Sequence, residues 1–272
     1  MQYMLISQLR SLAIGNRDSL TATTEQFYVN CYASFSFYVK SNNTGEIFMN
    51  MFQFAQIPPQ YGSLNQRYLA RINDTVMGAL ANHPRVLIAR IDLRILNNGG
   101  YSDNPLERDV PTCFVNIGVG LMKRFLASLN AQIATDQMNK AKQGKRIHPC
   151  PLNYVWVRER STSHNEHYHV ALVVNQDAYY PLGKLHYEGA LACMVNKAWA
   201  SALGLTVDEI KGLVHIPERP MYTLNRNHPP ARFQKDLGEV AVRLAYLAKA
   251  ETKILGDGRR NFGCSNPTKG SL

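Results

Sequence analysis

Apolar and polar residues alternate between positions 86 and 95, and a two-residue period of this kind predicts a β-strand. Two more segments, 153–159 and 166–174, are rich in β-branched and aromatic residues and predict two further strands joined by a polar turn. One face of the first strand would be apolar. The other face would carry charged side chains: Arg90, Asp92 and Arg94.

Apolar residues recur at three- and four-residue spacing elsewhere, which predicts helices at about 114–144, 185–203 and 232–253. A short strand is expected near 213–216, before Pro217. The resulting order is β-α-β-β-α-β, followed by a helix. This order indicates an α+β fold with a ferredoxin-like (split βαβ) sheet and added helices.

The first 84 residues have a different pattern, and we expect a helical N-terminal accessory region there. Residues 1–12 and the aromatic-rich segment 19–40 are its candidate helices. We expect the main domain to span residues 85–255 and a flexible basic C-terminal tail to span residues 256–272.

Composition narrows the class of protein. The chain has 30 Lys and Arg residues against 20 Asp and Glu residues, a formal net charge of +10, which favours a polyanionic partner over a neutral one. It has no apolar run of about 18 residues and no secretory leader pattern, so we expect neither a membrane partner nor export. Its five cysteines lack metal-site spacing, which favours a reducing cytoplasm.

His167 and His169 stand at the head of the strand predicted at 166–174. Residues two apart in a strand point to the same face, with about 7 Å between their backbones. The two imidazoles would therefore lie side by side, while Tyr168 and the following apolar residues enter the core. This arrangement suits a metal ion. The alternative is an exposed histidine pair in a solvated hairpin.

Glu159 is the candidate third ligand, because it ends the preceding strand close to the turn. Two imidazoles and one carboxylate leave coordination positions open, which is typical of a catalytic metal site. Two alternatives remain: Glu159 pairs with a neighbouring arginine, or Asp92 takes the third position.

Tyr246 and Lys249 lie three residues apart in the last predicted helix. At about 100° per residue they fall on the side opposite the apolar stripe, so Tyr246 is not expected to fill the core beneath this helix. We expect a phenol one helical turn from an ammonium group. Among the 14 tyrosines, only Tyr246 has this Tyr-x-x-Lys pattern.

Together these features resemble the HUH endonucleases that initiate rolling-circle replication, and most closely the inovirus gene-two-type replication proteins. The resemblance rests on segments 154–159, 167–170, 175–179 and 243–253 and covers about residues 85–253. It implies an HUH endonuclease sheet with Mg²⁺ or Mn²⁺ held by His167, His169 and Glu159. It also implies that Tyr246 is the nucleophile.

The resemblance implies nicking and rejoining of single-stranded or supercoiled origin DNA in a bacterial host cytoplasm, through a 5′-phosphotyrosine intermediate. Lys249 would assist the phenol, and one tyrosine would suffice, with Tyr222 and Tyr187 the next candidates. No Gly-x-x-x-x-Gly-Lys motif is present, so we expect no nucleotide cofactor and a separate host helicase. The candidate DNA contacts are Arg90, Arg94, Arg158, Arg160 and Lys253.

Two alternative functions remain open at this point. One is a prophage-derived DNA-binding regulator without nuclease activity, in which the intact acid, histidines and tyrosine would have no chemical use. The other is a metal-dependent hydrolase that activates water, in which Tyr246 would be incidental.

Overall fold

The computed structural model describes residues 28–31, 35–41, 47–95, 116–160, 166–251, 253 and 256–266, with side chains from Asn50 onwards. The chain divides into two compact units, residues 1–50 and 51–272. The predicted boundary after residue 84 therefore falls inside the second unit. The reason is that helix α2 (Gln66–Asn82) packs against the main sheet of that unit.

The first unit contains a three-stranded antiparallel sheet, in the order β1 (Tyr28–Cys31), β2 (Phe35–Ser41) and β3 (Ile47–Met49). The prediction of a helix over 19–40 is therefore wrong. The aromatic and β-branched residues of this segment favour a pleated strand and pair across a hairpin. The helix predicted over 1–12 lies outside the described residues.

The second unit is built on a six-stranded sheet whose described pairings are all antiparallel. Its order is β7-β4-β6-β5-β9, with β8 also paired to β4. The strands are β4 (Arg85–Arg94), β5 (Asn153–Arg160), β6 (Glu166–Asn175), β7 (Val214–His215), β8 (Met221–Asn225) and β9 (Phe262–Cys264). The predicted strands are confirmed within one or two residues, whereas β8 and β9 were not predicted.

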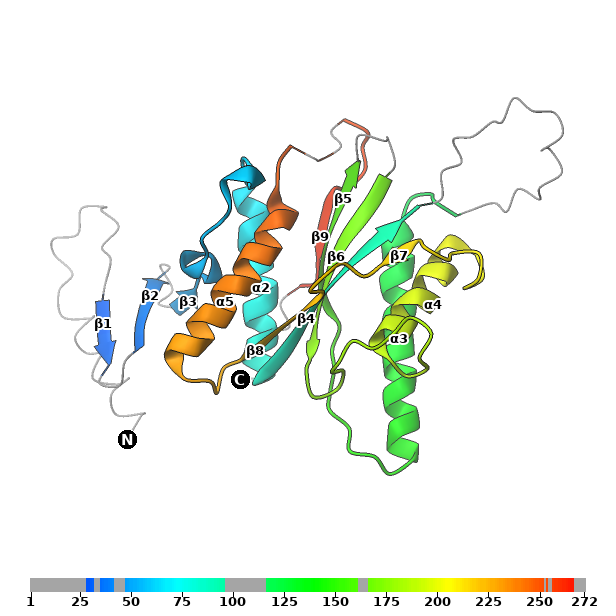
Figure 1. Cartoon of the computed structure of the whole chain (residues 1–272), viewed down its shortest axis with the longest axis horizontal. Coiled ribbons are helices and arrows are strands. Elements are labelled where there is room, and N and C mark those ends of the chain that lie inside the picture. Colours follow the sequence, from blue (N-terminus) through cyan, green and yellow to red (C-terminus); the bar gives the residue numbers. More distant parts are fainter. Residues whose placement is uncertain are drawn as a thin grey trace. The chain divides into compact units, whose positions relative to one another are not determined.

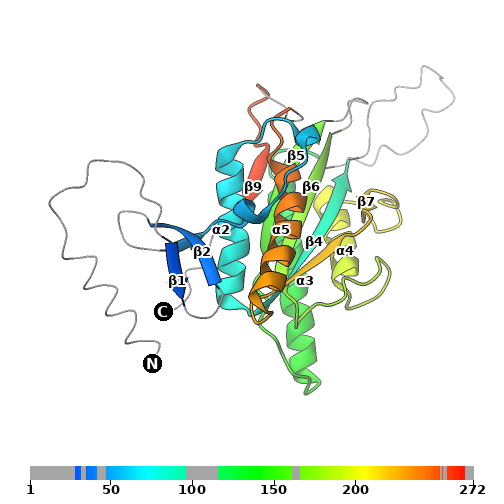
Figure 2. The ribbon, with the colours of Figure 1, turned by 60° about the vertical axis from the view of Figure 1, so that its left-hand side comes forward.

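Helices cover both faces of this sheet, with α2 and α5 (Pro230–Ala245) on one side and α3 (Leu121–Lys142) and α4 (Leu191–Leu203) on the other (Figures 1 and 2). This arrangement confirms the α+β class. Helix α3 begins later than predicted, after Gly120, whose φ of 89° lies in the left-handed region. Among the described residues, the helices are too short or too polar to cross a membrane.

The two faces of the sheet differ in polarity along β4. Its odd-numbered apolar residues enter the core beneath α3 and α4, together with Phe125 and Trp199. On the face beneath α2 and α5, Val86 and Ile88 are buried, but the following positions on that face are charged. The sheet therefore changes from an apolar to a polar surface along one face, and the candidate site lies at the polar end.

Residues 256–266 pair with this sheet and form ion pairs with it. Strand β9 pairs with β5, and the guanidinium of Arg158 makes hydrogen bonds of 2.7 Å to both carboxylate oxygens of Asp257. Gly263 lies against Trp156 so closely that a Cβ atom there would be 2.4 Å from the indole. The predicted flexible tail is therefore wrong for residues 256–266, because strand pairing and ion pairs hold this segment in place.

Candidate metal centre and active site

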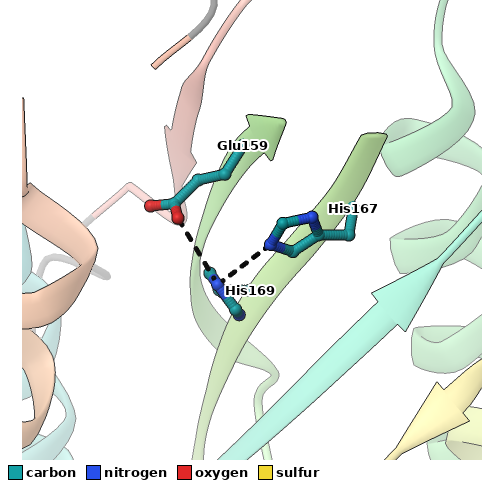
Figure 3. Close-up of side chains that lie close together, drawn as sticks. All are labelled: Glu159, His167 and His169. Carbon is teal, nitrogen blue, oxygen red and sulfur yellow. Dashed lines mark hydrogen bonds and ion pairs between the residues drawn. The ribbon is translucent and has the colours of Figure 1, made fainter. Parts of the chain in front are cut away.

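Glu159, His167 and His169 converge on one face of the hairpin formed by β5 and β6. Glu159 lies directly opposite His167 in the strand register, and His169 follows on the same face of β6. Their side chains point toward one another in Figure 3, and one ligand atom from each lies within 4.8 Å of the others. The structure thus brings together the three residues proposed as ligands.

Two of the three spacings in this group match those of ligands on a single divalent cation. The two Nε2 atoms of His167 and His169 are 3.3 Å apart, and His169 Nε2 is 3.5 Å from an oxygen of Glu159. Two ligand atoms that bind one such ion at about 2.0–2.2 Å lie about 3.0–3.6 Å apart. Glu159 and His169 are buried, whereas His167 is half-buried, so the site has an accessible side.

Asp92 supports the site from the neighbouring strand. Its Oδ1 atom is 2.6 Å from Nδ1 of His169, the ring nitrogen that faces away from Glu159, so a proton on Nδ1 leaves Nε2 free for a metal. Burial raises the pKa of the Asp92 carboxyl group, but the contacts with His169 and Arg90 outweigh burial and hold it well below its ordinary value. Asp92 is therefore placed to orient the His169 ring, and Glu159 is the carboxylate that completes the three-residue group.

Lys253 forms a buried ion pair with Glu159. Burial raises the pKa of Glu159, but the hydrogen bond with His169 and the charge of Lys253 overcome this effect and lower it to about 2. Burial also lowers the pKa of Lys253. The two residues are opposite each other in an isolated antiparallel bridge, which directs the ammonium group inward. Lys253 is thus directed at Glu159 rather than at solvent, and its contact with DNA stays a prediction.

Tyr246 lies edge-on to His169, although the local structure differs from the prediction. Helix α5 ends at Ala245, and Tyr246 begins a 3-10 turn, η4 (Tyr246–Ala248). The predicted helix to residue 253 is wrong, because bridges from Leu64 to Lys249 and from Glu159 to Lys253 draw the chain into extended conformation. The tyrosine ring is half-buried, with its centroid 5.5 Å from that of His169.

Cations and anions both surround the Tyr246 phenol. The Arg90 guanidinium carbon and the Lys249 ammonium nitrogen lie 5.4 and 5.2 Å from the ring centroid. Burial and the charges of Glu159 and Asp92 raise the pKa of Tyr246, while the charge of Arg90 acts in the opposite direction. The metal-free site therefore favours the neutral phenol, and Lys249 does not compensate for the burial.

The remaining predicted DNA contacts fall into two groups. Arg94 and Arg160 are exposed, and their contact with DNA stays a prediction. Arg158 is 1% exposed and bound to Asp257, on the sheet face opposite Glu159, and its contact with DNA also stays a prediction. Arg90 is 3% exposed, which excludes an open-surface contact and leaves it beside Tyr246.

Sequence reasoning missed two residues at this site. Tyr61 lies edge-on to Tyr246, with 5.6 Å between ring centroids, and nothing in its sequence context pointed to this contact. Arg243 lies one helical turn before Tyr246 on α5, and its position in that turn was the available signal. The tyrosines named as next candidates lie elsewhere: Tyr222 on β8, opposite Ile88, and Tyr187 in an exposed loop.

Comparison with known proteins places the chain in a family. The model of the YagK/YfjJ C-terminal domain matches residues 49–265, a range that contains the whole site. The chain belongs to this family. The matched range corresponds closely to the second compact unit.

Two members of the YagK/YfjJ family from Escherichia coli (strain K12) are similar over most of their length. The uncharacterized protein YagK is 39% identical over 201 residues, which cover 73% of this chain and 91% of YagK. The uncharacterized protein YfjJ is 34% identical over 209 residues, which cover 76% of this chain and 97% of YfjJ. No solved structure matches. The function must therefore be inferred from the site.

Proposed function

We propose that this protein is a metal-dependent DNA strand transferase of the HUH type that initiates rolling-circle replication through Tyr246. The observation that carries the proposal is the contact between the Tyr246 ring and His169, one of two imidazoles that share a face with a carboxylate. A nucleophile beside a metal-binding triad is what covalent phosphodiester cleavage requires. A binding protein or a hydrolase that activates water has no use for this phenol.

The topology supports the same proposal. Strands β4 and β5 run parallel with β6 between them, and β7 and β8 lie on the other side of β4. This is the strand order of a split βαβ, ferredoxin-like sheet, which the resemblance to HUH endonucleases implies. The histidines lie on the central strand β6, and the tyrosine follows the last helix.

In the proposed reaction, the Tyr246 oxygen attacks the phosphorus atom of a DNA phosphodiester and loses its proton to solvent. The new bond joins the tyrosine oxygen to the phosphorus atom, which stays attached to the 5′ oxygen of the downstream fragment. The bond from phosphorus to the 3′ oxygen of the upstream fragment breaks, and that oxygen takes up a proton. A bound Mg²⁺ or Mn²⁺ ion would polarise the non-bridging oxygens and offset their charge. Attack by a free 3′-hydroxyl reverses the step and rejoins the strands.

Charge supports DNA as the substrate. The +10 chain attracts a polyanion, and exposed Arg94 and Arg160 lie on the strands that carry the site. Single-stranded or supercoiled origin DNA would supply the unpaired strand, with a separate helicase to unwind the duplex.

The test is transfer of labelled DNA to the protein. We would incubate the full chain and Mn²⁺ with a random-sequence single-stranded pool, in which every short recognition sequence is represented. A 5′-phosphotyrosine retains the fragment on the 3′ side of the cut, so 3′-labelled strands should label the protein on a denaturing gel and 5′-labelled strands should not. Peptide mapping should place the link on Tyr246.

Two phenylalanine variants provide the matched comparison. Tyr246→Phe removes one hydroxyl group and should abolish the adduct, whereas Tyr61→Phe alters the adjacent ring and should retain it. An adduct in the Tyr246→Phe protein would assign the nucleophile elsewhere. DNA binding without any adduct in the wild type would favour the regulator instead.

A further inference from the structure

Arg90 is a buried cation with unused hydrogen-bond donors. Its side chain is 4% exposed, and Nη2 contacts Asp92 at 3.2 Å. Within the described part of the chain, neither Nε nor Nη1 has a hydrogen-bond partner. A buried guanidinium with unpaired donors is costly, because it has lost water without replacing it. Such a group is expected where a bound anion accepts the remaining hydrogen bonds.

Arg243 adds a second cation at the same place. Arg243 lies one helical turn before Tyr246, and the Arg90 guanidinium lies over the Tyr246 ring, so both cations belong to the surroundings of this tyrosine. Burial lowers the pKa of Arg90, the charge of Asp92 raises it, and the charge of Arg243 lowers it, which is the direction expected for two cations that repel each other. The Nε atom of Arg243 is also buried without a partner among the described residues. The residue as a whole is half-buried, so Arg243 forms the more accessible side of the pair.

The local charges do not cancel. The carboxylate of Asp92 is shared among Arg90, His169 and His215, and that of Glu159 between Lys253 and His169. No described carboxylate forms an ion pair with Arg243. The surroundings of Tyr246 therefore keep excess positive charge, and two guanidinium groups with unused donors are available there for one anion.

We propose that Arg90 and Arg243 form a phosphate-binding subsite, separate from the metal centre, that holds a phosphodiester of the DNA strand beside Tyr246. Contact with the tyrosine ring explains the position of Arg90 but gives none of its N–H groups a hydrogen-bond acceptor. It also does not explain why a second cation, Arg243, is found at the same place. A phosphate oxygen accepts hydrogen bonds from both guanidinium groups and neutralises their repulsion. The site would thus bind the strand through arginine when no metal is present.

The assignment of the bound anion as a DNA phosphodiester rests on the proposed function, but anion binding at the subsite can be tested without catalysis. In EDTA, we would compare thermal unfolding in sodium phosphate and in sodium chloride of equal ionic strength. Phosphate should raise the Tm of the wild type by about 3 °C, because a ligand that binds only the folded state stabilises it. Arg243→Gln should lose this shift. Arg232→Gln, on the same helix with a side chain 65% exposed, should keep it.

An equal shift in all three proteins, or no shift in any, would overturn the subsite. Circular dichroism reports whether Arg243→Gln folds. If it does not, Arg243→Lys serves instead: it keeps the charge but not the fork of donors, and it should lose at least half of the shift. A full shift in the lysine variant would reject the paired-guanidinium geometry.

A second measurement distinguishes a DNA phosphate from a free phosphate. In EDTA, Arg243→Gln should weaken binding of a single-stranded thymidine oligonucleotide about tenfold and reduce the slope of log affinity against log salt by about 0.7. Arg232→Gln should change affinity less than twofold. If phosphate raises the Tm of the wild type but Arg243→Gln leaves DNA affinity unchanged, the anion at the subsite is not a DNA phosphodiester. If the wild type forms no DNA adduct but both subsite measurements give the expected results, the proposed function is rejected and the subsite is retained.

Discussion

Lys253 and Glu159 face each other across an antiparallel bridge, and their buried side chains form an ion pair beside the two histidines. The carboxylate is divided between two partners, with one oxygen toward the ammonium group and the other 3.5 Å from His169. A cation at the triad would therefore sit near a fixed positive charge. Metal affinity and the Glu159–Lys253 pair are expected to oppose each other.

Replacement of Lys253 by Met should strengthen metal binding. The methionine keeps most of the buried stem but removes the charge that opposes a divalent cation, so we expect affinity for Mn²⁺ to rise about tenfold. Titration calorimetry with the metal-free protein measures this directly. Unchanged or weaker binding would mean that Lys253 chiefly holds the carboxylate in position.

Replacement of Asp92 by Asn should weaken metal binding between about 10- and 100-fold while the fold is retained. The carboxylate that accepts from His169 Nδ1 fixes the ring and increases its basicity, and such partners commonly contribute this much. His215→Gln is the control, since His215 contacts the other oxygen of Asp92 at 3.5 Å and lies outside the triad. Equal losses in the two variants would argue against a specific role for the His169 contact.

Arg158 and its neighbour Arg160 should differ sharply in their effect on stability. Arg158→Gln removes a buried guanidinium that forms a bidentate pair with the more exposed Asp257, and it should lower the free energy of unfolding by about 2–3 kcal/mol, as measured in urea. Arg160→Gln, at an exposed position, should change it by less than about 0.5 kcal/mol. Limited proteolysis should also release residues 256–266 first in the Arg158 variant, and equal stability of the two variants would contradict the structural role.

The metal-free protein should lose stability in acid partly through Glu159. Its pKa falls from 4.5 to about 2 on folding, so the folded state favours the ionised form. The resulting stability is fully present above about pH 4.5 and disappears as the pH falls toward 2. In EDTA, the stability difference between wild type and Glu159→Gln should therefore narrow across this range. A difference independent of pH would contradict the assigned pKa.

Local patterns were sufficient to predict the central part of the site. Alternation in β6 places His167 and His169 on one face and Tyr168 in the core, and the antiparallel pairing of β5 with β6 places Glu159 opposite His167. These relationships depend on a single pair of adjacent strands, whose register is set by the two-residue alternation of side chains between the faces of the sheet. Strands β4 to β7 and helices α3 to α5 were predictable for the same reason, whereas β1, β2, β8 and β9 were not.

Relationships between distant segments could not be predicted in this way. Lys253 reaches Glu159 through a bridge, and Tyr61 reaches Tyr246 because the chain after α5 pairs with residues before α2. Alternation along β4 placed Arg90 on the polar face but could not reveal that it would be buried beside Tyr246. The early end of α5 has the same origin, since these tertiary bridges override a continuous helical periodicity.

Strand β9 has a consequence for self-association. Without it, β5 would be an outer strand, with unpaired backbone groups beside Val155 and Val157. An outer strand of this kind readily adds a strand from another molecule. Residues 262–264 therefore act as an intramolecular cap on the strand that carries Glu159. A chain cut before Phe262 should form oligomers through β5 even where its metal ligands are all present.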